Sequence, residues 1–206
     1  MTAPVFEREA LLPLEQQELL WSDAATAGAL LALLGHVGGG VLLRARPGPV
    51  RDFWQNESRR LLEPSVPWRK VPLHCAHDRL LGGLDLSATL RSGRPVAQTG
   101  LLTECDGGVA LLPMAERADG GLLASLSSAL DRGELILERE GVTSRMPAAF
   151  AIVAFDEGAD EMETLDASLA ERLAAHIDLG MVAMNACDDF PWSRADIALA
   201  REQLPT

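Results

Sequence analysis

The chain has 206 residues, 48% of them hydrophobic, which is enough to bury the core of one large α/β domain and argues against disorder. Its formal net charge of -12 repels phosphate backbones and disfavours a nucleic-acid partner. Its three cysteines are far apart, so they form neither a disulfide framework nor a zinc-knuckle spacing. A reducing cytoplasm is the simplest setting for such cysteines, and the charges at residues 7–9 interrupt the N-terminus before any apolar stretch that a secretory signal would need.

Residues 24–43 carry no charge and are long enough to cross a membrane. However, glycines interrupt the second half of this stretch, and Arg44 and Arg46 follow it directly. We therefore predict no membrane span here, but a helix capped by Ser22 and running from Asp23 to about Leu34, then a glycine-rich turn and a buried strand.

The rest of the chain alternates apolar runs with amphipathic segments. Strands are predicted near residues 41, 71, 109, 150 and 176, helices over 51–62, 122–130 and 165–173, and a hairpin around Glu140 and Gly141. Such alternation is typical of a parallel sheet covered on both faces, which gives an α/β fold.

Three regions are expected. Residues 1–20 form an N-terminal extension, residues 21–180 form the α/β core, and residues 181–206 form the start of a helical lid or linker. A helix-like segment follows Pro191 and stops short, so we expect the chain to be part of a longer one.

Five segments, taken in order and spacing, resemble the AAA+ subunits of magnesium chelatase. They are residues 39–52 (first strand and P-loop), 78–85 and 100–102 (helix-2 insert), 138–150 (hairpin) and 169–173 (arginine-finger segment). The resemblance covers residues 21–179 and implies an AAA+ P-loop NTPase-like three-layer sandwich with a parallel central sheet.

The P-loop is degenerate when laid on the pattern G-x-x-x-x-G-K-[ST], whose glycines and consecutive N–H groups wrap phosphates. Ala45 and Val50 stand at the glycines, Arg51 at the lysine and Asp52 at the hydroxyl. A positive φ at β-branched Val50 would be strained. The candidate cofactor-binding residues, expected to bind nucleotide weakly or not at all, are Ala45, Gly48, Arg51 and Asp52.

Two further features weaken this loop. Pro47 and Pro49 donate no N–H, which removes two phosphate contacts. Asp52 would repel a phosphate by about 4 kcal/mol at ~4 Å and an effective dielectric of ~20. Arg51 offsets this repulsion only in part, because its guanidinium is planar and spreads its charge, unlike the compact ammonium of the usual lysine.

The catalytic carboxylates are also missing. A hydrolysing relative has Asp-Glu after the third core strand, one for Mg²⁺ and one to orient water, whereas this chain has Pro113 and Met114. Glu116 comes two positions too late. Asp156 and Glu157 stand where a sensor amide is expected. These losses resemble the D subunit, not the ATP-hydrolysing I subunit.

The resemblance implies a non-hydrolysing platform subunit of the enzyme that inserts Mg²⁺ into protoporphyrin IX in chlorophyll and bacteriochlorophyll biosynthesis. It implies no firmly bound cofactor, with ATP and Mg²⁺ used by the partner I subunit. It also implies a ring oligomer and a porphyrin-binding H subunit in the complex. Arg172 would be an arginine finger acting in trans, exposed and free of a tight carboxylate partner; its other interpretation is a solvated helix arginine.

Two alternatives remain: an active ATPase of the MoxR-like AAA+ branch, or a regulatory module that binds nucleotide without turnover. Other patterns have plainer interpretations. Residues 46–49 are typical of a surface turn and residues 156–166 of a solvated loop. His74, Cys75 and His77 lack a fourth ligand, so no metal site is predicted. Trp54 and Trp68 are expected to pack, and His176 to be a strand residue.

Overall fold

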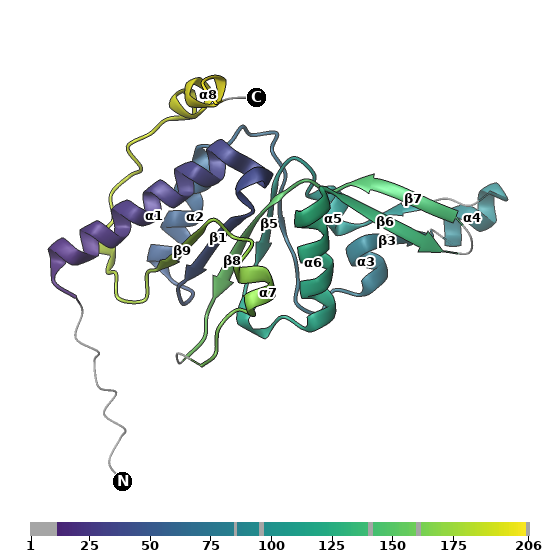
Figure 1. Cartoon of the computed structure of the whole chain (residues 1–206), viewed down its shortest axis with the longest axis horizontal. Helices are drawn as coiled ribbons and strands as arrows, with labels where there is room; N and C mark the ends of the chain where they lie inside the picture. Colours follow the sequence, from purple (N-terminus) through teal and green to yellow (C-terminus); the bar gives the residue numbers. More distant parts are fainter. Residues whose placement is uncertain (1–11, 85, 95–96, 140–141, 160–161, 205–206) are drawn as a thin grey trace, which may run out of the picture.

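The computed structural model describes residues 12–84, 86–94, 97–139, 142–159 and 162–204 (Figure 1). The helices are α1 (Leu14–Leu34), η1 (Gly35–Gly38), α2 (Pro49–Arg60), α3 (His77–Leu81), α4 (Leu86–Ser92), α5 (Leu101–Glu104), η2 (Ala115–Arg117), α6 (Gly120–Arg132), α7 (Ala167–Ala170), η3 (Met184–Ala186) and α8 (Arg194–Glu202). The strands are β1 (Gly40–Arg44), β2 (Trp68–Lys70), β3 (Gly82–Leu84), β4 (Ala97–Thr99), β5 (Val109–Leu112), β6 (Glu134–Arg139), β7 (Val142–Pro147), β8 (Ala151–Asp156) and β9 (Ala175–Asp178).

The central sheet has the order β2-β5-β8-β1-β9, and all of its pairs are parallel. The predicted parallel sheet is therefore confirmed, with strands near all five expected positions. The strand expected at residue 71 lies slightly earlier, at Trp68–Lys70. The pairing nevertheless continues to Val71, whose N–H donates to the Leu111 carbonyl at 2.7 Å.

Helices cover the sheet on both faces, which gives three layers (Figure 1). Every residue of β8 is buried, and its side chains alternate between two cores. Val153 and Phe155 pack on the face covered by α1 and α2, whereas Ile152 and Ala154 pack on the face covered by α6 and α7. The continuous apolar run thus reflects burial on two sides.

Helix α1 is longer than expected. It begins at Leu14 after Pro13, so the prediction that Ser22 caps it is wrong. Helix-forming residues precede Ser22 without a break, and Gln17 and Trp21 are buried by tertiary packing. By length and composition Leu14–Gly38 could cross a membrane, but core helices of soluble proteins pass the same test. The predicted helix, glycine turn and strand are confirmed.

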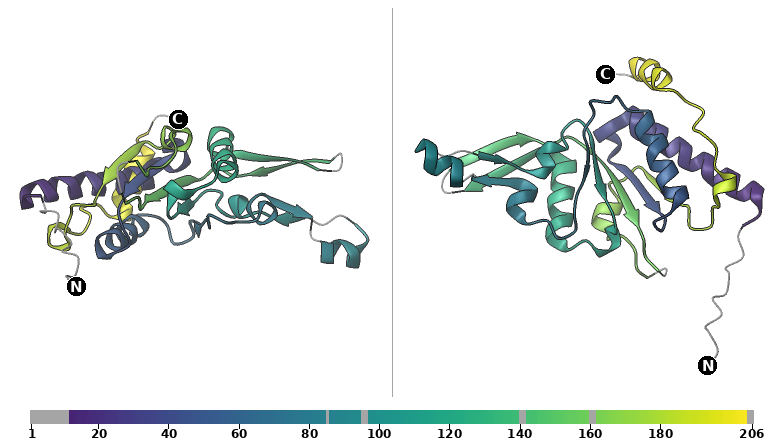
Figure 2. Two further views of the ribbon diagram at one scale, coloured as in Figure 1. Left: turned by 90° about the horizontal axis from the view of Figure 1, so that it is seen from below. Right: turned by 180° about the vertical axis from the view of Figure 1, so that it is seen from behind.

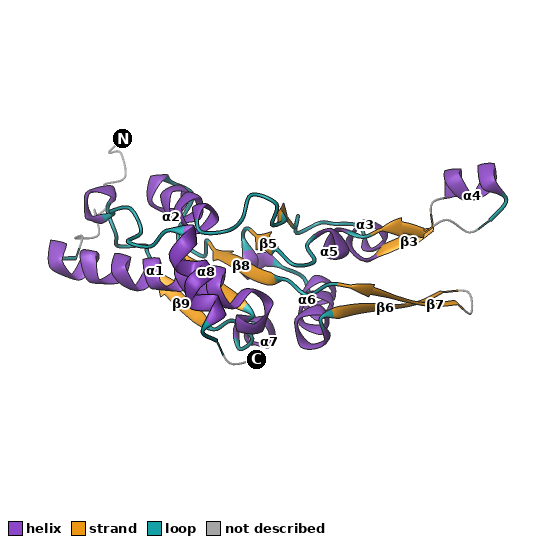
Figure 3. Cartoon of the chain, turned by 90° about the horizontal axis from the view of Figure 1, so that it is seen from above, coloured by secondary structure: helices purple, strands orange, loops and turns teal. Residues whose placement is uncertain are grey.

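Two projections extend from the same side of the core (Figures 2 and 3). One is the antiparallel hairpin of β6 and β7, which confirms the predicted hairpin, although Glu140 and Gly141 lie outside the described residues. The other contains β3, α4 and β4 and corresponds to the predicted insert, of which Asp85 is not described. The helix predicted over 165–173 is shorter, since α7 covers Ala167–Ala170 and tight turns follow.

The segment after β9 is tied to α1 and α2 by side chains. Trp21 Nε1 donates to the Asp188 carbonyl at 2.8 Å, and Gln17 Oε1 accepts from Ala183 N at 2.8 Å. Glu57, whose residue is only 8% exposed, accepts from Phe190 N at 2.8 Å and pairs with Arg60 at 2.7 Å. We call residues 179–193 the strap.

The predicted division into three regions does not coincide with gaps in this packing. Helix α1 crosses the boundary placed between residues 20 and 21. Beyond residue 180, the strap and α8 pack back on the core, where Phe190 and Ile197 are buried. The division into extension, core and lid or linker remains a prediction.

The Glu57 carboxylate predicts a pH-dependent stability. Hydrogen bonds from Arg60 lower its pKa, burial opposes this shift, and the Phe190 N–H lowers the pKa further. A lowered folded-state pKa means that the stabilisation is complete above the unfolded pKa and is lost as pH falls through the folded one. We expect Glu57→Gln to lower the free energy of unfolding at neutral pH by about 1–3 kcal/mol.

This difference should shrink from neutral to acidic pH, as the pH falls below the ordinary glutamate pKa of 4.5 and through the lowered pKa of folded Glu57, because the carboxylate then takes up a proton. Denaturant unfolding at both pH values measures it. Glu18→Gln, which changes an exposed carboxylate on α1, is the matched control and should have little effect. Equal losses for the two variants at neutral pH would contradict the role of Glu57.

Candidate functional site

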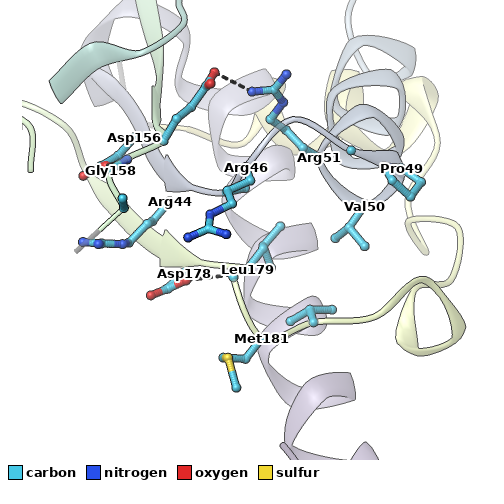
Figure 4. Close-up of a pocket in the computed structure, with 16 residues that line it drawn as sticks. Arg44, Arg46, Pro49, Val50, Arg51, Asp156, Gly158, Asp178, Leu179 and Met181 are labelled. Atoms are coloured by element: carbon cyan, nitrogen blue, oxygen red, sulfur yellow. Dashed lines mark hydrogen bonds and ion pairs between the residues drawn. The ribbon is translucent and has the colours of Figure 1, made fainter. Parts of the chain in front are cut away.

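A cavity of about 730 Å³ lies at the carboxyl ends of β1, β8 and β9, against the start of α2 (Figure 4). This edge is where open parallel sheets bind their ligands. The lining residues come from four segments of the chain: residues 44–46, 48–51, 156–159 and 178–182.

The connection from β1 to α2 forms one wall of this cavity. Ala45 continues the strand, with its N–H donating to the Asp156 carbonyl at 3.0 Å, and Gly48 precedes the helix. The prediction that this loop leads from strand to helix is confirmed, although the helix already begins at Pro49. Val50 is therefore helical and carries none of the strain expected from a positive φ. The start of α2 presents the N–H groups of Val50 and Arg51, since proline has none.

Arg51 is already engaged by groups of its own chain. Its Nη1 lies 2.7 Å from Glu157 Oε1, and its guanidinium lies 4.9 Å from the centre of the Phe155 ring. Both partners of the ion pair are only 15% exposed. The residue at the lysine position is thus held at the end of β8, with its charge neutralised by a carboxylate.

Of the four predicted cofactor-binding residues, the structure brings Ala45, Gly48 and Arg51 to the cavity. Asp52 is not among the lining residues, and its side chain is 67% exposed. Water screens a carboxylate at such a position. The expected phosphate repulsion at Asp52 is therefore overestimated, and a different carboxylate, Glu157, opposes anion binding here.

A turn with a left-handed residue follows β5. Met114 has a left-handed backbone with φ of 50°, the one positive φ of a non-glycine residue in the described ranges. The turn brings the fully buried Glu116 side chain back towards β8, where its Oε2 accepts from Glu157 N at 2.9 Å. Its sequence position gave Glu116 no role, and no sequence pattern shows that its side chain returns to β8. Its observed role is to support the loop after β8.

Charges around the cavity balance one another. Arg44, Arg46 and Arg51 line it together with Asp156, Glu157 and Asp178. Backbone N–H groups hold two of these carboxylates: Asp156 accepts from Gly158 N at 2.9 Å, and Asp178 accepts from Gly180 N at 2.8 Å. A triphosphate needs an excess of positive charge and N–H donors, and this lining offers three cations against three anions.

Arg172 lies just before β9, at the opposite end of the strand from the cavity. It is not free of a carboxylate, so that expectation is wrong. Its Nε and Nη2 each donate to an Asp131 carboxylate oxygen at 2.7 Å, and Nη1 donates to the Ser168 carbonyl. The Arg172 hydrogen bond lowers the pKa of Asp131. The two residues are 41 positions apart, and only the packing of α6 beside α7 joins them.

The remaining candidates have structural roles. Trp54 is fully buried and donates from Nε1 to the Ala24 carbonyl at 2.7 Å, so its packing role is confirmed. His176, on β9, lies 2.9 Å from the Ala170 carbonyl through Nε2. No group of three His, Cys, Asp or Glu side chains suited to a metal occurs among the described residues.

The sequence comparisons point to one family. No family model matches the chain. It is 36% identical over 185 residues to the magnesium-chelatase 60 kDa subunit of Cereibacter sphaeroides, covering 89% of this chain and 28% of that protein. It is 31% identical to the 67 kDa subunit of Chlorobaculum parvum, covering 66% of this chain and 22% of that protein. The chain is homologous to magnesium-chelatase D subunits. It spans under a third of the length of these D-subunit relatives.

The fold comparison agrees. A structure of the complex between subunits BchI and BchD of magnesium chelatase matches with a TM-score of 0.59 at 16% identity, covering 95% of this chain and 68% of that one. The AAA+ three-layer fold predicted from the D-subunit resemblance is therefore confirmed. The chain also resembles the magnesium-chelatase 38 kDa subunit of Cereibacter sphaeroides, at 28% identity over 151 residues.

The Arg51–Glu157 pair predicts weak nucleotide binding and a way to improve it. We expect wild type to show no micromolar ATP binding in calorimetry, whereas Glu157→Gln should bind ATP about tenfold more tightly, or roughly 1.4 kcal/mol. The variant frees the Arg51 charge and removes an opposing one. Glu171→Gln, which removes an exposed carboxylate just before β9, should match wild type. Unchanged affinity in Glu157→Gln would rule out this ion pair as the block.

Proposed function

We propose that this chain is the AAA+ module of a D-type magnesium-chelatase subunit and serves as an assembly platform that does not hydrolyse ATP. The observation that carries this proposal is the Arg51–Glu157 ion pair at 2.7 Å. In this pair Arg51, which stands at the lysine position of the P-loop, is bound by the chain's own carboxylate Glu157. The pair lies in the cavity that corresponds to the nucleotide site of a AAA+ ATPase.

The end of β5 supports the same conclusion. Phosphoryl transfer in this class needs a carboxylate for Mg²⁺ and a group that orients water. Pro113 and Met114 offer neither group, and the nearby Glu116 carboxylate is buried and bonded to the backbone of Glu157. The subunit would therefore need a partner for ATP and Mg²⁺.

The proposed partner is the ATP-hydrolysing I subunit. The solved complex of BchI and BchD and the similarity to the 38 kDa subunit support this partner. In the proposed assembly, this domain contributes to a ring, an H subunit holds protoporphyrin IX, and the complex inserts Mg²⁺ in the cytoplasm during chlorophyll or bacteriochlorophyll biosynthesis.

A second candidate is a regulatory module that binds nucleotide without turnover. The cavity, at about 730 Å³, is within the usual size of a small-molecule site, and Arg46 lines it with no hydrogen-bonded or ionic partner in the described chain. The missing carboxylates after β5 disfavour the remaining alternative, an active MoxR-like ATPase.

Two measurements on the purified chain test the platform. We expect no magnesium-dependent ATP hydrolysis above background, and retention of an I subunit in pull-downs both with and without ATP. A turnover near the enzyme median of ~10 s⁻¹, abolished by Arg51→Ala, would overturn the non-hydrolysing proposal. Micromolar ATP binding without turnover would instead favour the regulatory module.

Arg172 gives the sharpest test in the reconstituted complex. As a finger acting in trans it would stabilise charge on a neighbour's γ-phosphate, an effect worth roughly 10³ to 10⁵ in rate for related enzymes. Arg172→Ala should leave the melting temperature near that of wild type, because its ion pair is exposed, and should reduce chelatase activity by about tenfold or more.

Asp131→Ala is the matched control, since it breaks the same ion pair and leaves the Arg172 charge in place. It should retain chelatase activity. If both variants lose activity alike, Arg172 acts only through its contact with Asp131, and if neither loses activity, Arg172 is a surface charge.

A further inference from the structure

A second cavity, of about 350 Å³, lies at the opposite end of α2 from the first one. Its walls are the last turns of α2, the loop that leads into β2, the first residue of β2 and the start of α8. The lining residues are Asn56, Arg59, Arg60, Leu62, Glu63, Pro64, Val66, Trp68 and Arg194. No feature of the proposed platform function uses this cavity.

Hydrogen-bond donors dominate its polar lining. Arg59 is exposed, and its side chain makes no hydrogen bond or ion pair in the described part of the chain. Trp68 Nε1 and Arg194 Nε are both buried and make no hydrogen bond. Arg194 reaches Glu63 only at 3.8 Å, and its Nη2 reaches the Arg60 carbonyl at 3.4 Å. Buried donors without acceptors are costly, so this lining favours a ligand that brings acceptors.

The charge of the cavity also favours a negatively charged ligand. Glu57 neutralises Arg60, which also donates to the carbonyls of Phe190 and Trp192. Glu63 faces Arg194 loosely and is largely exposed. The lining thus contains three guanidinium groups and one carboxylate, Glu63, while Glu57 neutralises one of the three from outside the lining. An excess of positive charge remains, in a chain whose net charge is -12.

The positive surface continues beyond the cavity along β2. Within the described residues, β2 is an edge strand of the sheet. After Trp68 it carries Arg69 and Lys70, which are both exposed and whose side chains make no hydrogen bond or ion pair within the described chain. A small anion would use only the cavity, whereas an extended segment could engage the cavity and the strand together. Leu62, Pro64 and Val66 add an apolar wall.

We propose that this surface, formed by Arg59, Arg194, Trp68, Arg69 and Lys70, binds an acidic segment of a partner polypeptide. A carboxylate of the segment would enter the cavity and accept from Arg59 and Arg194, with an adjoining apolar side chain against the Trp68 indole. Further acidic side chains would face Arg69 and Lys70. Arg–carboxylate pairs of this kind are among the stronger polar contacts in proteins.

Binding is measured by fluorescence anisotropy with a fluorescein-labelled peptide of Glu-Glu-Leu repeats, beside a peptide of Gln-Gln-Leu repeats. We expect the Glu peptide to bind saturably and the Gln peptide not to bind. The double variant Arg59→Gln with Arg194→Gln should weaken it about tenfold, as expected for losing charged hydrogen bonds. Arg91→Gln with Arg132→Gln, which lowers the net charge equally at exposed positions outside both cavities, should bind as wild type does.

The chain offers two further readouts. Glu63→Gln should tighten binding, because it removes the carboxylate that competes for Arg194. Lys70 is the single lysine of the chain, so a carbodiimide cross-link to the Glu peptide should map to it by mass spectrometry. If Arg194→Gln impairs folding, Arg59→Gln alone carries the test, since that side chain has no partner to lose.

Three results would overturn the proposal. Equal weakening by both double variants would mean that only the overall charge matters. Equal binding of the Gln peptide would exclude carboxylate recognition. Saturable binding of citrate or inorganic phosphate, lost in Arg59→Gln, without binding of the Glu peptide would assign the cavity to small anions instead of a polypeptide.

Discussion

The structure depends on the burial of β8 from both sides. Because its alternate side chains belong to two separate cores, helices must cover each face of the sheet. The neighbouring strands β1 and β5 both run parallel to it. This constraint also places the ends of β1, β8 and β9 at one edge, where the first cavity forms. The site is therefore a product of the core rather than of a separate loop structure.

Within that cavity, the chain has replaced ligand contacts with internal ones. Arg51 has a carboxylate partner from β8's end, and the buried Glu116 accepts a backbone N–H that would otherwise be unpaired. Such contacts hold the loop geometry without nucleotide, because the Arg51 guanidinium and the Glu116 carboxylate each have a partner inside the chain. The same contacts that stabilise this edge of the sheet also neutralise the cation that a phosphate would need.

The sequence was informative where local pattern decides structure and less so where packing decides it. The short apolar run Val109–Leu112 predicted a buried strand, and the proline and aspartate around Arg51 showed that the loop departs from an active P-loop. The start of α1, by contrast, depends on Gln17 and Trp21 contacting the distant strap. The Asp131 partner of Arg172 and the return of Glu116 to β8 likewise need tertiary proximity, which no single-sequence pattern encodes.

The strap has a mechanical consequence. Its residues 179–182 form one wall of the first cavity, while Gln17, Trp21 and Glu57 anchor its following part to α1 and α2. Phe190 also occupies the space beside Gly28 of α1, where any added side-chain carbon would collide with its ring. This wall of the cavity is therefore attached to the helical layer formed by α1 and α2. A ligand or a neighbour that displaced this wall would also disturb the hydrogen bonds and packing that hold the strap on α1 and α2, so the wall is braced by the helical layer.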